Sequence, residues 1–399
     1  MKRNAIHWGL LALSLLCGGA LYFENASTAR AGGANTPWGT IVTTLPATAG
    51  SPFAINPKTN AVYSVSSDGK AILVLDGTTN QVTAQIPIPG GVNGTWFDAR
   101  QDRLYVLNTT SSTSSAVVID AKTNSVINTI ALVQPQGSVP NTTFIAVNSA
   151  TGKLYGGYDL ESVRIGPGLL AVWDLATGAL LTTVSIDFPA DAAINPKTNR
   201  LYVTDNFSSQ LVVVDGVTNQ VIDRIQTGQA YFPDGCYVPG PCITQASSPF
   251  GVSISEKTNR LYVIDIEDGT LYVIDGATDR VIGGPVALGG PGAGAYQNAI
   301  LDDLHDVLYI PTVATGPASV IALDVKTLKP VGAPVIVGAA WLPPGCFFGP
   351  GGTFTCTTFG DIGGAGPLNP ANHTIYASGA SKYVIQIKST DHEGQEALK

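Results

Sequence analysis

The 399-residue sequence is short of charge. Only 13% of its residues are charged, about half of the roughly 25% that is typical of soluble domains. The formal net charge is −8 at pH 7, and beyond Lys2 and Arg3 no run of basic residues occurs. Because nucleic acids are bound mainly through clustered Lys and Arg side chains, the sequence predicts no nucleic-acid partner.

Histidine and methionine are also scarce, with four and one copies. Beyond the N-terminal segment the histidines are His305 and His373, in predicted hairpin turns, and His392, in the C-terminal tail. None is placed for a Ser-His-Asp triad. A copper site or a c-type haem lacks its ligands. We therefore predict no catalytic residue, no haem and no copper.

The first 31 residues have the pattern of an export signal. Lys2 and Arg3 precede an almost uncharged apolar run, and Ala29-Arg30-Ala31 is a small-x-small cleavage site. We expect a signal peptide over 1–31, a linker over 32–38, and a periplasmic or secreted mature protein without a membrane span. A location on the cell surface and an uncleaved N-terminal anchor are the alternatives.

Four of the five cysteines follow this signal, in two close pairs. Four cysteines allow three connectivities. We expect the local pairing, because exported thiols tend to oxidise. Neither pair has the CxxC spacing of a zinc site. The expected disulfides are Cys236–Cys242 and Cys346–Cys356.

Glycine and proline are abundant, with 45 and 26 copies, and one segment recurs along the chain. NPKTNRLYVTD, from Asn195, is similar to NPKTNAVYSVS from Asn56, SEKTNRLYVID from Ser255 and NPANHTIYASG from Asn369. A tyrosine marks each of seven units: Tyr63, Tyr105, Tyr155, Tyr202, Tyr262, Tyr309 and Tyr376. The shortest spacing, from Tyr63 to Tyr105, fits one four-stranded propeller blade of roughly 40–45 residues.

Each unit continues with an apolar run that ends in Asp and a turn, as in LVVVDGVTNQV from Leu211. The run predicts a strand that is buried on both faces. We expect the Asp to accept hydrogen bonds from turn amides, and the Gly and Asn that often follow to tolerate positive φ. The tyrosine should pack between blades, with its hydroxyl at a polar edge.

The seventh unit is incomplete. KYVIQIK, residues 382–388, supplies its third strand, and a polar tail follows over 389–399. The missing fourth strand resembles GTIVTTLPA, residues 39–47, which has no unit before it. We predict that this N-terminal strand completes the last blade. Residues 39–388 then form one all-β, seven-bladed propeller with four-stranded blades and a closed ring.

RLYVTD (200–205), RLYVID (260–265) and RLYVLN (103–108) resemble the YVTN-family β-propeller repeat. The resemblance covers nearly all of residues 39–388. It implies a bacterial or archaeal seven-bladed propeller that is exported or surface-associated. Such proteins are known mostly as binding or surface proteins, although a fold alone does not define a function.

The copies differ most in two connections between blades, residues 231–251 and 341–364, which contain the cysteine pairs and several aromatic residues. Both should project over the same face of the ring, which we call the Cys-loop face. The opposite face should carry the regular hairpin turns. Two interpretations stay open: a binding surface held rigid by disulfides, or a cap over the central channel.

Polar residues are expected at the channel mouth on the Cys-loop face. Asp191 and Asn298 occupy matching positions before their blade tyrosines, and Asp205 and Asp265 match after them. Carboxylates around one funnel can hold Ca²⁺ or a cationic ligand; a solvated acidic rim is the alternative. We expect no cofactor, and Ca²⁺ is the one ion that these residues leave open. The candidate ligand-binding residues are Asp159, Asp191, Asp205, Asp265, Asn298 and Asp361.

We expect a monomeric, non-enzymatic binding or scaffold protein that uses the Cys-loop face to bind a protein, peptide or glycan. One alternative is a metal-assisted lactonase- or lyase-type enzyme at the channel mouth. It would require the carboxylates to converge at roughly 2.3–2.6 Å from one point. The second alternative is a structural surface-layer protein, which would self-assemble.

Overall fold

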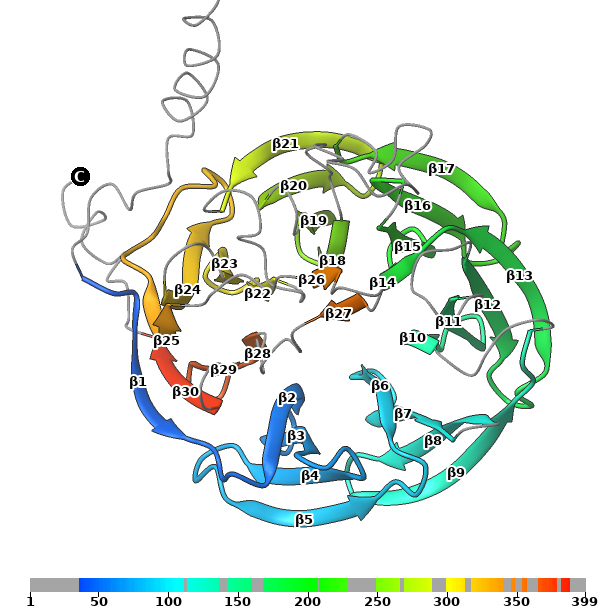
Figure 1. The fold of residues 1–399 in the computed structure, drawn as a ribbon, viewed down its shortest axis with the longest axis horizontal. Coiled ribbons are helices and arrows are strands. Elements are labelled where there is room, and N and C mark those ends of the chain that lie inside the picture. Colours follow the sequence, from blue (N-terminus) through cyan, green and yellow to red (C-terminus); the bar gives the residue numbers. More distant parts are fainter. Residues whose placement is uncertain are drawn as a thin grey trace, which may run out of the picture.

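The computed structural model describes thirteen stretches of the chain: residues 36–110, 113–135, 142–159, 168–206, 208–228, 249–265, 269–288, 299–312, 317–340, 346–348, 354–356, 365–378 and 382–387. These residues form strands and turns arranged as a ring (Figure 1). Within them, no helix is long and apolar enough to cross a membrane.

Seven four-stranded antiparallel sheets make up the ring, so the predicted fold is confirmed. We call the strands of a blade A to D, from the centre outward. Blade 1 consists of β2 (Ala49–Asn56), β3 (Ala61–Ser66), β4 (Ala71–Asp76) and β5 (Val82–Pro87). Blade 2 consists of β6 (Val92–Asp98), β7 (Arg103–Thr109), β8 (Ser114–Asp120) and β9 (Ser125–Leu132). Blade 3 consists of β10 (Thr142–Asn148), β11 (Lys153–Asp159), β12 (Gly168–Asp174) and β13 (Leu180–Ile186).

The remaining blades continue this order around the ring. Blades 4 to 7 consist of β14 (Pro189–Asn195), β15 (Arg200–Asp205), β16 (Gln210–Asp215), β17 (Val221–Gln226); β18 (Pro249–Ser255), β19 (Arg260–Asp265), β20 (Thr270–Asp275), β21 (Arg280–Ala287); β22 (Ile300–Asp302), β23 (Val307–Thr312), β24 (Pro317–Asp324), β25 (Val335–Ala340); and β28 (Ala365–Asn369), β29 (Thr374–Ser378), β30 (Lys382–Ile387), with β1 (Gly39–Thr44) as strand D.

The N-terminal strand closes the ring, as the incomplete seventh unit predicts. β1 pairs antiparallel with β30, from Gly39 opposite Ile387 to Thr44 opposite Tyr383. The segment before β1 also reaches the neighbouring blade 6. The Trp38 indole donates to the Val320 carbonyl at 2.9 Å, and its ring lies 4.7 Å from that of Tyr309, centroid to centroid. Both ends of the sheet-forming chain therefore meet at blade 7.

The hydrophobic core lies between blades, which explains the near-continuous apolar strands. One buried cluster joins Tyr155 and Val172 of blade 3 to Leu201, Val203 and Val212 of blade 4. Strands B and C are covered on both sides, whereas strand D is largely exposed, as in β17. Burying one large apolar side chain in such a core stabilises the fold by about 1.5–3 kcal/mol.

The turns between strands C and D use the predicted aspartate. Asp215 accepts from the amides of Val217 at 3.0 Å and Thr218 at 2.7 Å, and the Thr218 amide contributes most to lowering the pKa of Asp215. Asn219 has the expected positive φ of 59°. The same geometry recurs at Asp76, Asp120, Asp174, Asp275 and Asp324.

Glycine supplies the positive φ in the turn of blade 3, where Gly178, at the position of Asn219, has a φ of 73°. The glycine directly after the aspartate does not. Gly77, Gly216 and Gly276 are not among the positive-φ residues of the described chain. Their role is close approach instead: a Cβ on Gly276 would lie 2.7 Å from Asn195 Nδ2 of the preceding blade. At Gly77 and Gly276 glycine is thus used because another blade packs against the backbone, whereas the atoms close to Gly216 belong to Asn199 of the same blade.

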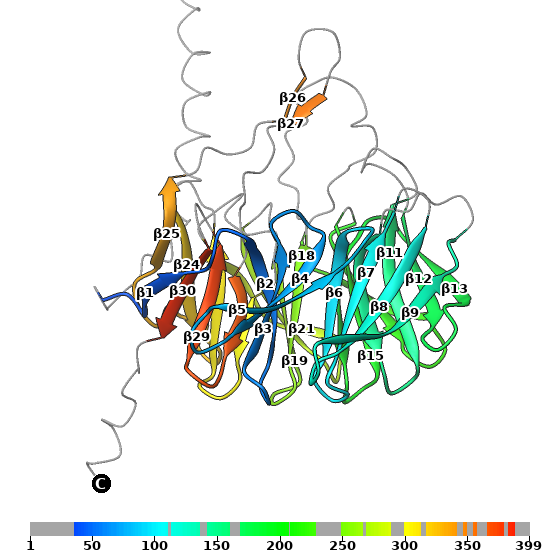
Figure 2. The ribbon, with the colours of Figure 1, turned by 90° about the horizontal axis from the view of Figure 1, so that it is seen from below.

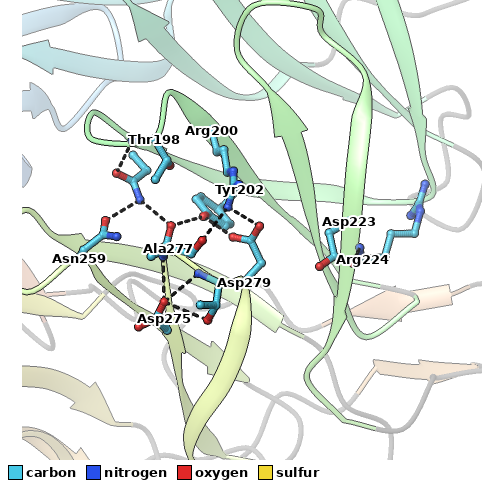
Figure 3. A network of polar contacts seen from close by, with 12 residues as sticks. Thr198, Arg200, Tyr202, Asp223, Arg224, Asn259, Asp275, Ala277 and Asp279 are labelled. Carbon is cyan, nitrogen blue, oxygen red and sulfur yellow. Dashed lines mark hydrogen bonds and ion pairs between the residues drawn. The ribbon is translucent and has the colours of Figure 1, made fainter.

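The blade tyrosines pack between neighbouring blades, as predicted, and three of them also donate a hydrogen bond to the next blade. Figure 3 shows the seam between blades 4 and 5, where Tyr202 is buried and donates to Asp279 Oδ1 at 2.6 Å. Arg200 pairs with the same carboxylate, and Asn195 Nδ2 donates to Asn259 Oδ1 at 2.8 Å. Tyr63 makes the equivalent bond to Asn124 and Tyr376 to Asn80. The repeated segment is therefore largely an inter-blade fastening.

Candidate functional site on the Cys-loop face

The two faces of the ring carry different kinds of chain connection. The A–B and C–D turns lie on one face, which we call the turn face, and a separate hairpin stands clear of the ring on the other (Figure 2). This hairpin consists of β26 (Cys346–Phe348) and β27 (Phe354–Cys356) and follows β25 of blade 6. Viewed down the ring, it lies over the central region (Figure 1).

The register of this hairpin bears on one predicted disulfide. β26 and β27 pair antiparallel with Cys346 directly opposite Cys356. Directly opposite residues of antiparallel strands have Cα atoms about 4.5–5.5 Å apart, which lies within the range that a disulfide spans. The Cys346–Cys356 bridge stays a prediction that this backbone register supports. Cys236 and Cys242 lie outside the described residues.

Asp205 lies at the end of β15 that faces the Cys-loop side, and its side chain is buried, with 1% of the residue exposed. Its Oδ1 accepts from the amide of Phe188, in the connection that enters blade 4, at 3.1 Å. Asn108, the matching residue of blade 2, accepts from the amide of Gly90 at 2.8 Å. Both residues therefore hold a connection between blades, a role that either a carboxylate or an amide fulfils.

The second oxygen of Asp205 belongs to a small charged group that the sequence did not suggest. Arg224 Nη1, from β17, lies 3.8 Å from Asp205 Oδ2. Desolvation, and next the charge of Asp205, raise the pKa of Asp187 at the end of blade 3, while Arg224 opposes this shift. Asp187, Asp205 and Arg224 are far apart in the repeat pattern, and only the folded ring brings them together. The group presents two carboxylates with one guanidinium.

Asp191 joins two blades near the centre of the ring. It is half-buried on β14, and its Oδ2 accepts from the amide of Val252 on β18, the innermost strand of blade 5, at 3.1 Å. Its own amide donates a hydrogen bond to Thr204 Oγ1 at 3.0 Å. The Asp191 carboxylate thus holds the backbone of the next blade by a hydrogen bond, at the innermost strands of the ring.

The other predicted mouth residues are only partly described. Asp265 ends β19 and is fully buried. The backbone of Asp159 ends β11, opposite Gly168, and its side chain lies outside the described part, as do Asn298 and Asp361. Within the described residues, no group of three or more His, Cys, Asp or Glu is arranged to hold a metal ion. The calcium hypothesis therefore stays a prediction, because the side chains of three of its six candidate residues lie outside the described part.

These hydrogen bonds fix the backbone on the Cys-loop face of the ring. Asp205 and Asn108 fix the entering connections, and Asp191 ties the central strands of blades 4 and 5. Such bracing holds backbone in place before any ligand arrives, which lowers the ordering cost of binding. The arrangement can present fixed backbone, a raised hairpin and the exposed carboxylate of Asp187 to a partner.

No protein-family model matches the sequence. No curated protein matches it either. Among solved structures, the chain is similar to the crystal structure of the Myceliophteria thermophila Cps50 (Swd1) β-propeller domain, with a TM-score of 0.57. The match covers 88% of this chain and 100% of that domain at 9% sequence identity. The chain is a seven-bladed β-propeller, and its resemblance to the YVTN repeat stays a prediction.

Proposed function

We propose that this protein is an exported, non-enzymatic binding scaffold that holds a protein, peptide or glycan partner on its Cys-loop face. The observation that carries the proposal is the β26–β27 hairpin, which stands clear of the ring over its central region (Figure 2). A closed propeller has no structural need for an extra hairpin, because its blades already pair internally.

The difference between the two faces supports the same proposal. The turn face is made of short turns whose polar groups are used in contacts within the turns and between blades. The sequence predicts that the long connections lie on the Cys-loop face, and loops placed by a rigid scaffold are common sites of recognition. A disulfide between Cys346 and Cys356 would hold the hairpin in one conformation before binding, which favours affinity.

The test compares the wild-type protein with a variant that lacks the hairpin. Residues 341–364 are replaced by Ile-Pro-Gly-Gly, the sequence of residues 88–91, which joins β5 to β6 in this same ring. Ligands are first selected by the wild-type protein from a random peptide display library and a glycan array. Affinities for the selected ligands are then measured by calorimetry.

We expect the selected ligands to bind the hairpin variant at least about tenfold more weakly, a loss of about 1.4 kcal/mol. The matched control is Val217→Ser, a change at a turn-face residue that is 67% exposed, which should bind like the wild type. Circular dichroism checks that both variants keep the ring. Equal affinities for wild type and hairpin variant, or no selected ligand at all, would contradict the proposal.

A further inference from the structure

On the turn face, two histidines replace the usual residues of the repeat on the two sides of one seam. In most A–B turns the third residue after the strand-A end is Thr (Thr59, Thr151, Thr198, Thr258), and in three of them the fourth is Asn (Asn60, Asn199, Asn259); blade 2 has Gln101 and Asp102 there, and blade 3 has Gly152 at the fourth position. Blade 6 has His305 at the third position, and blade 7 has His373 at the fourth. The two histidines meet across the seam between blades 6 and 7, with ring centroids 4.8 Å apart.

The backbone holds both histidines firmly. His373 adopts φ of 52°, like the asparagines at its position, and its carbonyl accepts from the Ile387 amide at 2.9 Å. The His305 amide donates to Asp302 Oδ1 at 3.1 Å. The side chains are accessible, since His373 is exposed and the His305 side chain is 43% exposed. The pair is thus fixed at its base and open to solvent.

Asp302 sets the tautomer of His305. Its Oδ2 lies 2.8 Å from His305 Nδ1, and the carboxylate is nearly buried, with 5% of the side chain exposed. A carboxylate only accepts hydrogen bonds, so Nδ1 carries the proton and Nε2 keeps its lone pair. A carboxylate on one nitrogen and a free lone pair on the other is the arrangement found behind metal-binding histidines.

The ring separation also fits two imidazoles that share one ion. With metal–nitrogen distances of about 2.0–2.1 Å and a tetrahedral angle, two such rings have centroids roughly 5 Å apart. The observed centroid distance of 4.8 Å is close to this value, and the two rings meet edge to face at an interplanar angle of 68°. Neutral imidazole suits zinc, copper and nickel, whereas magnesium and calcium prefer oxygen ligands.

The surrounding charges do not compete for this position. Asp306, in the same turn, is paired with Lys257 at 2.6 Å and Lys326 at 2.7 Å. Asp303 accepts from Ser255 of blade 5 at 2.6 Å. Asp302 is therefore the carboxylate that acts on the histidine pair, and its charge favours a bound cation.

We propose that His305 and His373 bind one divalent transition-metal ion of the zinc type, with Asp302 orienting His305 and water completing the coordination. The site joins blades 6 and 7. The N-terminal segment, which pairs with the last strand of blade 7, also contacts blade 6 at this seam. The metal site is separate from the Cys-loop face, and it does not depend on the proposed binding function.

The experiment titrates untagged protein with Zn²⁺ in a calorimeter and follows thermal unfolding with and without Zn²⁺. We expect one ion per chain and a higher unfolding midpoint in its presence. The variants use residues that the repeat itself has at these positions: His305→Thr, His373→Asn and Asp302→Asn. Each should keep the metal-free midpoint close to that of the wild type, which separates lost binding from lost folding.

His305→Thr and His373→Asn should each weaken Zn²⁺ binding at least tenfold and remove the shift in midpoint. Asp302→Asn keeps the turn but loses the carboxylate, and a change behind a ligand typically costs about 10–100-fold in metal affinity. His392→Ala, in the C-terminal tail, is the control and should bind like the wild type. No saturable binding up to about 1 mM Zn²⁺, or wild-type binding in both histidine variants, would overturn the proposal.

Discussion

The seam between blades 4 and 5 and the seam between blades 6 and 7 solve the same problem differently. In the first, Tyr202, Arg200 and Asn195 reach the C–D turn and the A–B turn of the next blade. In blade 7 the outer strands β30 and β1 come from opposite ends of the chain, so no C–D turn joins them. Tyr309 stacks on Trp38 there instead, and His305 contacts His373.

The comparison shows what the repeat requires and what it tolerates. Every blade keeps a buried tyrosine at the seam, so packing of the ring is common to both solutions. The contact of the tyrosine varies: Tyr202 donates to a turn residue, Tyr309 packs against the ring of Trp38 from the N-terminal segment, and Tyr155 and Tyr262 make no hydrogen bond to the next blade within the described residues. Closing the ring therefore rests on the chain ends at one seam and on the repeat at the others.

The largest effect is expected from removing the closing strand. Deletion of residues 39–47 takes away β1, and β30 then exposes an unpaired edge next to blade 6. The loss should be comparable to the whole stability of a typical domain, about 5–15 kcal/mol. We expect no cooperative thermal transition by circular dichroism and aggregation by size-exclusion chromatography. A variant that unfolds like the wild type would refute closure by β1.

A large effect is also expected at alkaline pH, which acts on all seams together. Burial raises the pKa of Tyr63 and of Tyr155 to about 12, and burial and then the Asp279 hydrogen bond raise that of Tyr202. Because the folded pKa exceeds the unfolded value of 10.0, this stability is complete below pH 10 and is lost as pH rises toward 12.

Ultraviolet absorbance of tyrosinate and circular dichroism, recorded in the same titration, check this prediction. We expect the seam tyrosines to ionise together with unfolding. Ionisation of all fourteen tyrosines near pH 10 in a ring that keeps its native spectrum would contradict it.

The smallest effect distinguishes the two seams directly. Tyr202→Phe removes a hydrogen bond to a charged acceptor, which typically contributes about 1.5–3 kcal/mol. Tyr309→Phe is the matched change, because no hydrogen bond to the Tyr309 hydroxyl is found within the described residues while its ring stacks on Trp38. We expect a loss of about 2 kcal/mol for the first and under about 0.5 kcal/mol for the second. Urea unfolding measures both, and equal losses would show that the seams are alike.

The fold was predictable because the same strand and turn pattern occurs in seven units of the sequence. Seven tyrosines at blade spacing and one orphan strand, residues 39–47, were enough to predict the closed ring. The role of Asp205 was not predictable in the same way. Its register places it at the correct face, but only the folded chain shows that the Phe188 amide uses its oxygen and that Arg224 lies beside it.

The side-chain contacts between neighbouring blades could not be predicted from the repeat pattern. The sequence places His305 and His373 in equivalent turns, and the structure confirms this, yet nothing in the pattern says that adjacent turns touch at these side chains. The same holds for Gly276, whose need for a small residue arises from Asn195 of the preceding blade. Such requirements depend on how blades tilt against one another, which no single unit encodes.

Closure by β1 also has a consequence for the order of events during synthesis. Among the strands of the ring, the one synthesised first, from Gly39, pairs with the one synthesised last, ending at Ile387. Six blades can pair internally before β30 is available, but the seventh cannot. Contacts of such high sequence separation form slowly. In the final step of folding, pairing of β1 with β30 therefore competes with pairing of the exposed edge of β30 with another molecule.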